Sequence, residues 1–208
     1  MTSVLFRRSP AAAVVFVLVL VGVEAQGPGS TIPTPEIFEA IEVAPGRTIC
    51  EIGAGDGELS VEAARLVGAT GRVFTSELGE ERLRELRDGV ERSGLANITV
   101  VAAHPDRTNL PESGCDAVFM RNVYHHFGNP AAMNASIAAS LRPGGRVAVV
   151  DFRPDGGEAS RPEDRDEDGS HGIRAETVSR EMQAAGLEPV RTRTSDGRWY
   201  MVVFVKPL

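Results

Sequence analysis

Positively charged residues are in short supply in this 208-residue chain. It has 22 lysines and arginines against 29 aspartates and glutamates, which gives a formal net charge of -7. A protein that binds nucleic acid along a broad surface normally carries a basic face there. The charge balance therefore argues against a nucleic-acid partner of that kind.

Cysteine and histidine are scarce as well, with two cysteines and four histidines in the chain. The cysteines do not form a C-x-x-C pair, and the histidines lack the Cys and His partners at the spacing of a zinc site. The G-x-S-x-G turn of serine hydrolases is also missing. We therefore expect no metal site. The length of the chain suits one domain.

The N-terminus has the layout of a secretory signal peptide. Arg7 and Arg8 precede an uninterrupted apolar run over residues 11–21, and Ala25 closes the segment as a small residue at a cleavage site would. The run is short for a membrane span, which needs about 20 apolar residues. We expect residues 1–25 to be a signal peptide or an uncleaved N-terminal anchor, in an exported or membrane-anchored protein. A misassigned start codon is the alternative.

A linker is expected next, because residues 26–35 are rich in Gly, Pro, Ser and Thr. Thr34 has the residue type of a helix N-cap, and Pro35 suits the first helical position. We expect a short helix over residues 36–41 and place the folded domain at residues 36–208.

The rest of the chain alternates apolar strand patterns with amphipathic helix patterns. The expected strands cover residues 48–52, 72–76, 98–102, 116–120, 146–151, 188–194 and 199–206, and the expected helices cover residues 58–67, 80–93, 130–141 and 173–185. Such alternation predicts an α/β fold with a doubly wound parallel sheet. The turn at Ser195-Asp196-Gly197 makes the last strand antiparallel to the one before it. Residues 152–172 form a long polar loop, either a mobile lid or a solvated surface loop.

The two cysteines fall in this pattern at Cys50, late in the first strand, and Cys115, at the start of the fourth. Those positions are at opposite ends of neighbouring strands. A disulfide needs Cα atoms within roughly 7 Å of each other. We therefore expect two free thiols, although an exported protein could form a disulfide.

One stretch organises the domain, the sequence ICEIGAGDGE over residues 49–58. It reads as a short buried strand, a glycine-rich turn and the start of a helix. Glycine lets the backbone turn sharply and lets a ligand approach closely, and a parallel sheet binds ligands at the carboxyl ends of its strands. The turn is therefore the expected ligand site.

The pattern E-x-G-x-G-x-G, from Glu51 to Gly57, resembles motif I of the class I S-adenosylmethionine (SAM)-dependent methyltransferases. The resemblance spans roughly residues 36–206 and implies a Rossmann-like sheet of order 3-2-1-4-5-7-6 with strand seven antiparallel. It also implies SAM as cofactor and methyl transfer as activity. The helices that often precede the first strand in that family are largely missing here.

The resemblance and the strand ends together give the expected cofactor site. The glycine turn should pass under the methionine part of SAM, with Glu51 ordering the turn. A carboxylate at the end of strand two, Glu77, can accept hydrogen bonds from the ribose hydroxyls, and Asp106 is expected beside the adenine. The expected cofactor-binding residues are Glu51, Gly53, Ala54, Gly55, Gly57, Glu77, Asp106, Arg121 and Asn122.

The segment after strand four carries the expected catalytic residues, Tyr124, His125 and His126. In the family this region faces the methyl acceptor. Histidine titrates near neutral pH and can take a proton from an attacking oxygen or nitrogen, and Tyr124 or His125 could orient the acceptor. The alternative is that the histidines pack against the next helix without taking part in the reaction.

No Asn-Pro-Pro-Tyr sequence follows strand four, so a nucleic-acid base is not the expected acceptor. A small-molecule or lipid-like acceptor remains, and the N-terminus could add membrane association. Two alternatives to a methyltransferase stay open. One is a non-enzymatic binding protein with the same fold, and the other is an NAD-dependent oxidoreductase. The oxidoreductase is disfavoured because the third glycine comes one residue earlier than in G-x-G-x-x-G.

Overall fold

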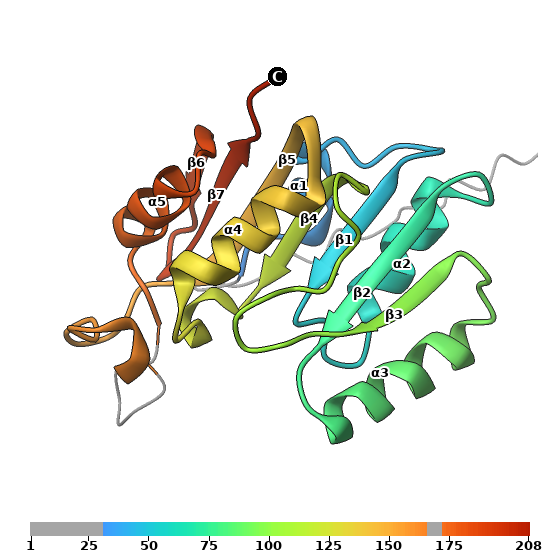
Figure 1. Cartoon of the computed structure of the whole chain (residues 1–208), viewed down its shortest axis with the longest axis horizontal. Helices are drawn as coiled ribbons and strands as arrows, with labels where there is room; N and C mark the ends of the chain where they lie inside the picture. Colours follow the sequence, from blue (N-terminus) through green and yellow to red (C-terminus); the bar gives the residue numbers. More distant parts are fainter. Residues whose placement is uncertain (1–30, 166–171) are drawn as a thin grey trace, which may run out of the picture.

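A single seven-stranded sheet forms the centre of the molecule. The structure is a computed structural model that describes residues 31–165 and 172–208. The strands are β1 (Thr48–Ile52), β2 (Arg72–Glu77), β3 (Ile98–Ala102), β4 (Cys115–Arg121), β5 (Leu141–Phe152), β6 (Glu188–Thr194) and β7 (Trp199–Val205). Their order across the sheet is β3-β2-β1-β4-β5-β7-β6, and β7 alone runs antiparallel to its neighbours on both sides. The predicted fold class and strand order are confirmed (Figure 1).

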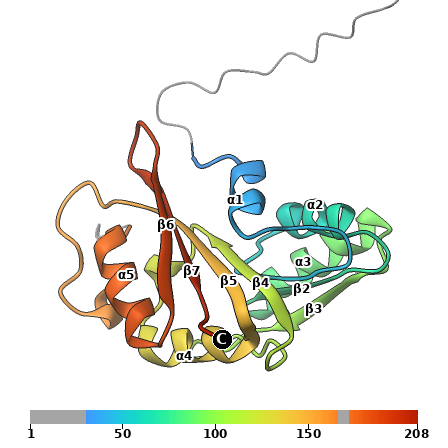
Figure 2. The same cartoon turned by 90° about the horizontal axis from the view of Figure 1, so that it is seen from above.

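Helices cover both faces of the sheet. They are α1 (Thr34–Ala40), α2 (Glu58–Val67), α3 (Glu80–Ser93), α4 (Pro130–Ser140) and α5 (Ala175–Ala184), with short 3-10 helices η1 (Tyr124–His126) and η2 (Pro162–Asp164). Figure 2 shows α1 and α2 on one face and α4 and α5 on the other. Each face has its own buried apolar cluster, as the alternation of side chains along a strand requires. Cys50 and Ile52 of β1 belong to the cluster under α4 and α5, whereas Ile49 belongs to the one under α1 and α2.

The folded domain begins earlier than the sequence pattern suggested. α1 starts at Thr34 rather than at residue 36, its N-cap is Pro33, and no side chain caps it. Ile32 is fully buried in the cluster under α1. Residues 32–35 are therefore part of the fold and not of the expected linker, because Ile32 and the first turn of α1 pack on the sheet. The expected signal peptide or anchor, residues 1–25, lies outside the described residues.

The expectation of two free thiols is wrong. Cys50 and Cys115 form a disulfide, with their Cα atoms 5.9 Å apart. The register of β4 against β5 shifts between Cys115 and Ala117. Val118 and Met120 face the same cluster as Cys50, and strict alternation from them would put Cys115 on the opposite face. The irregular start of β4 turns Cys115 to the same face, so that it meets Cys50 inside the cluster.

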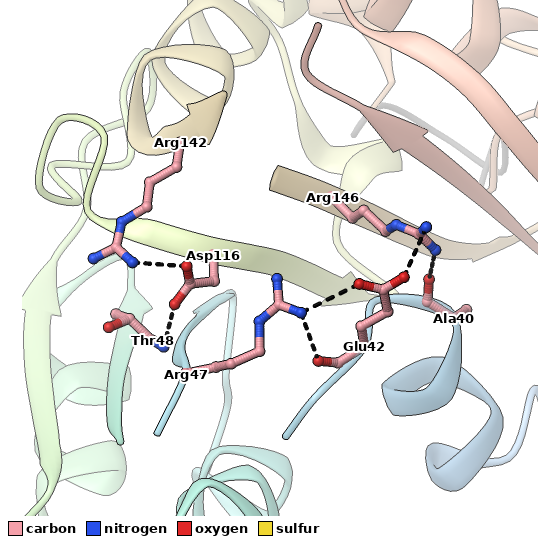
Figure 3. A network of polar contacts seen from close by, with 7 residues as sticks. All are labelled: Ala40, Glu42, Arg47, Thr48, Asp116, Arg142 and Arg146. Atoms are coloured by element: carbon pink, nitrogen blue, oxygen red, sulfur yellow. Dashed lines mark hydrogen bonds and ion pairs between the residues drawn. The ribbon is translucent and has the colours of Figure 1, made fainter. Parts of the chain in front are cut away.

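The amino-terminal edge of the sheet is closed by paired charges (Figure 3). Glu42, after α1, accepts from Arg146 of β5 at 2.8 Å and from Arg47 at 3.2 Å. Asp116 of β4 accepts from the Thr48 backbone N–H and from Arg142, both at 2.7 Å. These contacts hold α1, β1, β4 and β5 together at the edge opposite to the glycine turn. Within the described ranges, 31–165 and 172–208, no helix has the length and apolar character to cross a bilayer.

Candidate functional site

The glycine turn links β1 to α2 in a left-handed backbone conformation. Gly53, Gly55 and Gly57 all have positive φ, at 68°, 57° and 85°. The backbone N–H groups of Gly53 and Ala54 donate to the Ser76 carbonyl at 2.9 and 3.1 Å, which ties the turn to the end of β2. The turn is thus tied to its neighbours by hydrogen bonds within the chain.

The three glycines serve different purposes. A Cβ at Gly53 would lie 2.4 Å from a methyl carbon of Val123, and one at Gly57 would lie 2.8 Å from Leu86. Both glycines therefore allow other parts of the chain to pack against the turn. A Cβ at Gly55 would meet no atom within 4 Å. Gly55 is the glycine of the turn that presents bare backbone to open space, as a cradle for a ligand does.

Glu77 ends β2 directly beside this cradle. One oxygen of its carboxylate accepts from the Gly55 backbone N–H at 2.8 Å, and the other accepts from the Leu78 N–H at 2.9 Å. The residue is only 5% exposed. A carboxylate has about four lone-pair positions, so both oxygens keep acceptor capacity for further hydroxyl donors.

Glu51 occupies the other side of the turn. Its side chain points to the face of α2 and accepts a hydrogen bond from the Ser60 hydroxyl. Burial raises the pKa of Glu51 to about 8, against lowering contributions from Ser60 and from the positive charge of Arg121. Glu51 therefore couples β1 to α2 on either side of the turn, which agrees with its expected ordering role. Sequence reasoning missed Ser60, which lies nine residues on and in the first turns of α2.

Asp106 lies in an exposed turn after β3, at the same edge of the sheet. Its backbone N–H donates to Nδ1 of His104 at 3.3 Å, and the backbones of His104 and Arg107 form an isolated bridge. The Asn109 side chain ties the far end of the turn to the Ala102 carbonyl at 2.8 Å. The turn is ordered by its own chain, and the contact of Asp106 with adenine stays a prediction.

The segment after β4 packs against the glycine turn. Arg121 is half-buried, and Asn122 is exposed with a positive φ of 62°. The Asn122 N–H donates to the Val150 carbonyl at 2.9 Å, which extends the link between β4 and β5. Val123 then fills the space above Gly53. This contact brings the expected cofactor residues and the expected catalytic segment together.

Tyr124 is fully buried, and its hydroxyl faces the interior of the protein. The hydroxyl accepts from the Asn134 side chain at 2.7 Å and donates to Glu181 of α5 at 3.0 Å. Burial, reinforced by the charge of Glu181, raises the pKa of Tyr124 well above its usual range. Arg165 completes the group, since its guanidinium contacts Glu181 and the Phe127 carbonyl. This arrangement gives Tyr124 a structural task, holding η1 against α4 and α5.

The two histidines differ in their surroundings. His125 is fully buried and contacts Asp151 of β5 through Nδ1, at 2.9 and 3.1 Å from the two carboxylate oxygens. His126 is exposed and lies against His125, with ring centroids 3.9 Å apart. Sequence reasoning missed Asp151. The signal that could have found it is its place near the carboxyl end of β5, because the same kind of position on β2 singled out Glu77. In the part of the chain that the structure describes, no group of three or more acidic, His or Cys residues could hold a metal ion.

Comparisons with known proteins agree with this geometry. Residues 49–145 match a family described as "Methyltransferase domain". That segment runs from β1 through the glycine turn and η1 to β5. Over this segment the chain is similar to the methyltransferase domain family. The family expected from the E-x-G-x-G-x-G pattern is thereby supported over the residues that form the site.

A curated relative is the ubiquinone/menaquinone biosynthesis C-methyltransferase UbiE of Pseudomonas putida, 32% identical over 120 residues. The alignment covers 55% of this chain and 45% of that protein. The chain thus spans about half the length of the curated relatives that it matches.

Solved structures share the architecture over most of the chain. A SAM-dependent methyltransferase from Aquifex aeolicus superposes with a TM-score of 0.71 at 19% identity, over 83% of this chain and 89% of that one. The [4+2]-cyclase SpnF gives the same TM-score at 14% identity, over 84% and 80% of the two chains. At these identities the likeness establishes the fold.

Proposed function

We propose that this chain is a SAM-dependent methyltransferase whose acceptor is a small, lipid-like molecule with a quinol-type ring. One observation carries the proposal most directly. The open backbone of Gly55 lies beside the buried carboxylate of Glu77, at the carboxyl edge of a sheet with the methyltransferase strand order. The match of residues 49–145 to the methyltransferase domain family supports it independently.

The residues present suit SAM as cofactor. The Gly55 backbone leaves room for the ligand, and Glu77 retains acceptor capacity for two ribose hydroxyls. Arg121 supplies a positive charge near the expected methionine end, Glu51 ties the turn there to α2 through Ser60, and Asp106 lies in the turn expected beside the adenine. When bound, the cofactor supplies a methyl group activated by attachment to a sulfonium. The task of the chain is to align the acceptor with that methyl group in a site that excludes water.

The acceptor class rests on the UbiE relative and on side chains near the carboxyl edge. Phe152 of β5 and Trp199 of β7 pack edge to face, with ring centroids 5.0 Å apart, and His125 lies 5.0 Å from Phe152. Aromatic rings pack favourably on one another, so this group suits an aromatic acceptor. The guanidinium of Arg198 lies over the Phe152 ring at 4.5 Å and gives this aromatic group a positive charge.

A reaction other than methyl transfer is the second candidate. The structural likeness to a protein described as a [4+2]-cyclase favours it, because the same fold there accompanies a different chemistry. The two candidates differ in one measurable quantity, the transfer of the methyl group from SAM to the acceptor.

The test incubates the full chain with methyl-labelled SAM and a short-chain prenylated 1,4-naphthoquinol, and follows the label by mass spectrometry. The proposal predicts a methylated quinol and an equal amount of demethylated cofactor. Glu77→Gln should lower the rate at least tenfold. Asp116→Asn is the matched control, because Asp116 lies at the opposite edge of the sheet, and its rate should stay within twofold. Cofactor binding without label transfer to any quinol would contradict the acceptor class.

We also propose that the chain works in an oxidising compartment, either exported or anchored by its N-terminal segment. The disulfide between Cys50 and Cys115 supports this, because such bonds persist mainly outside the reducing cytosol. The basic and apolar pattern of residues 1–25 supports it as well. A methyltransferase there would depend on SAM supplied from the cytosol. Cell fractionation combined with thiol alkylation tests the proposal, and a cytosolic, fully alkylated protein would contradict it.

A further inference from the structure

A fully buried carboxylate, Asp151, stands at the carboxyl end of β5 and is not among the residues expected to bind the cofactor. Its oxygens accept three hydrogen bonds. The Phe152 backbone N–H donates at 2.8 Å, the His125 backbone N–H donates at 3.2 Å, and Nδ1 of the His125 ring lies at 2.9 and 3.1 Å. A buried carboxylate is costly unless donors satisfy it, and these three donors do so.

The arrangement decides which nitrogen of His125 carries the proton. Both carboxylate oxygens already accept from backbone amides, which can only donate. An ionised carboxylate has no proton of its own, so it can only accept a hydrogen bond from the ring. Nδ1 must then be the protonated nitrogen, and a neutral His125 carries its lone pair on Nε2. The same logic holds the imidazole of a catalytic triad in its working tautomer.

The ring is also held in one orientation, and the segment that carries it packs on the glycine turn. The ring lies between His126, with centroids 3.9 Å apart, and Phe152, with centroids 5.0 Å apart. Two residues before His125, the Val123 side chain packs on Gly53 of the glycine turn. One residue before it, the Tyr124 hydroxyl is fixed by Asn134 and Glu181. The two residues directly before His125 are therefore both anchored.

We infer that Asp151 is a positioning residue, which holds His125 ready to take the proton that the methyl acceptor loses. The inference rests on the proposed methyltransferase function and extends it. In the step, the acceptor O–H gives its proton to Nε2 of His125, and the ring carbon made nucleophilic by the resulting oxyanion forms a bond to the methyl carbon. The bond between the methyl carbon and the sulfonium sulfur breaks, and its electron pair stays on sulfur. The hydrogen of the methylated ring carbon then leaves as a proton and the oxyanion is reprotonated, which restores the aromatic quinol.

The first part of the test needs no acceptor. The full chain is labelled with 15N-histidine, and the His125 signals are assigned by their loss in His125→Gln. The inference predicts that the neutral form of the ring carries its proton on Nδ1. In Asp151→Asn the side-chain amide can donate to Nδ1, so the ring should change to the form protonated on Nε2. A wild-type ring protonated on Nε2, or an unchanged tautomer in Asp151→Asn, would overturn the inference.

The second part measures methyl transfer to the prenylated naphthoquinol. Asp151→Asn should lower kcat at least 100-fold, within the range expected for losing an oriented general base, with the SAM dissociation constant within twofold of wild type. Asp116→Asn should change neither quantity. An unchanged kcat in a folded Asp151→Asn variant would refute the inference, whereas a wild-type chain that does not bind SAM would refute the proposed function. If no transfer to this quinol occurs, the tautomer measurement decides.

Discussion

Removal of the disulfide should cost the domain a large part of its stability. The bond joins residues 65 positions apart, Cys50 in β1 and Cys115 in β4. In the chain-entropy account, closing a loop of that length lowers the entropy of the unfolded chain enough to stabilise the fold by about 4 kcal/mol. Both residues are fully buried in the apolar cluster under α4 and α5. We therefore choose the double variant Cys50→Ala/Cys115→Ala, which adds no buried polar group.

The assay is urea unfolding of the oxidised wild type, the reduced wild type and the double variant. With a slope of about 2.5 kcal/mol per molar urea, the loss corresponds to a midpoint lower by about 1.5 M in the double variant. The reduced wild type should unfold near the double variant. Equal midpoints in all three samples would refute the loop-entropy reasoning. Alkylation of two cysteines in unreduced, denatured protein would refute the disulfide itself.

Three further perturbations follow from the site. Gly53→Ala should lower the unfolding free energy by about 2 kcal/mol, because its Cβ would collide with Val123 at a positive φ; thermal unfolding measures the loss. Arg165→Met should cost about 3 kcal/mol in urea unfolding, because it leaves Glu181 without its cation. For Glu51, the folded pKa of about 8 lies above the unfolded value of 4.5, so the folded state holds an extra proton between these pH values. The unfolding free energy should therefore fall as the pH rises through this window, by up to about 1.4 kcal/mol per pH unit. Glu51→Gln should flatten this dependence of the unfolding free energy on pH. An unchanged pH dependence in the variant would exclude Glu51 as its cause.

The sheet could be predicted from sequence because local signals repeat along it. Short apolar strands alternate with amphipathic helices, and turns such as Ser195-Asp196-Gly197 mark the ends, so the α/β class and the direction of the last strand followed. The strand order came from the resemblance of the glycine motif to the methyltransferase family. The glycine turn and Glu77 could be located from local signals as well, since each stands at the end of a strand. What these positions contact, such as Val123 above Gly53, depends on packing between segments far apart in the chain.

The misses have a common physical origin in the tertiary structure. The disulfide depends on an irregular start of β4, which the alternation pattern of the sequence does not reveal. The bond between Asp151 and His125 joins residues 26 positions apart. The hydroxyl of Tyr124 looked available for catalysis in the sequence, but it is directed to Glu181 on a helix 57 residues further on. Residue type and strand position identify candidates, and only the packed structure assigns their partners.

The most direct test of the account is a calorimetric titration of SAM into the full chain, with Glu77→Gln and Asp116→Asn alongside. The side-chain amide in Glu77→Gln would keep one oxygen for the Gly55 N–H but lose the second carboxylate oxygen that the ribose needs. The account predicts that the wild type binds SAM with a micromolar dissociation constant and that Glu77→Gln binds at least tenfold more weakly, a loss of about 1.4 kcal/mol in binding free energy. Asp116→Asn should bind SAM as tightly as the wild type. A folded wild type that does not bind SAM, or a Glu77→Gln variant that binds equally well, would contradict the assignment of this edge of the sheet as a cofactor site.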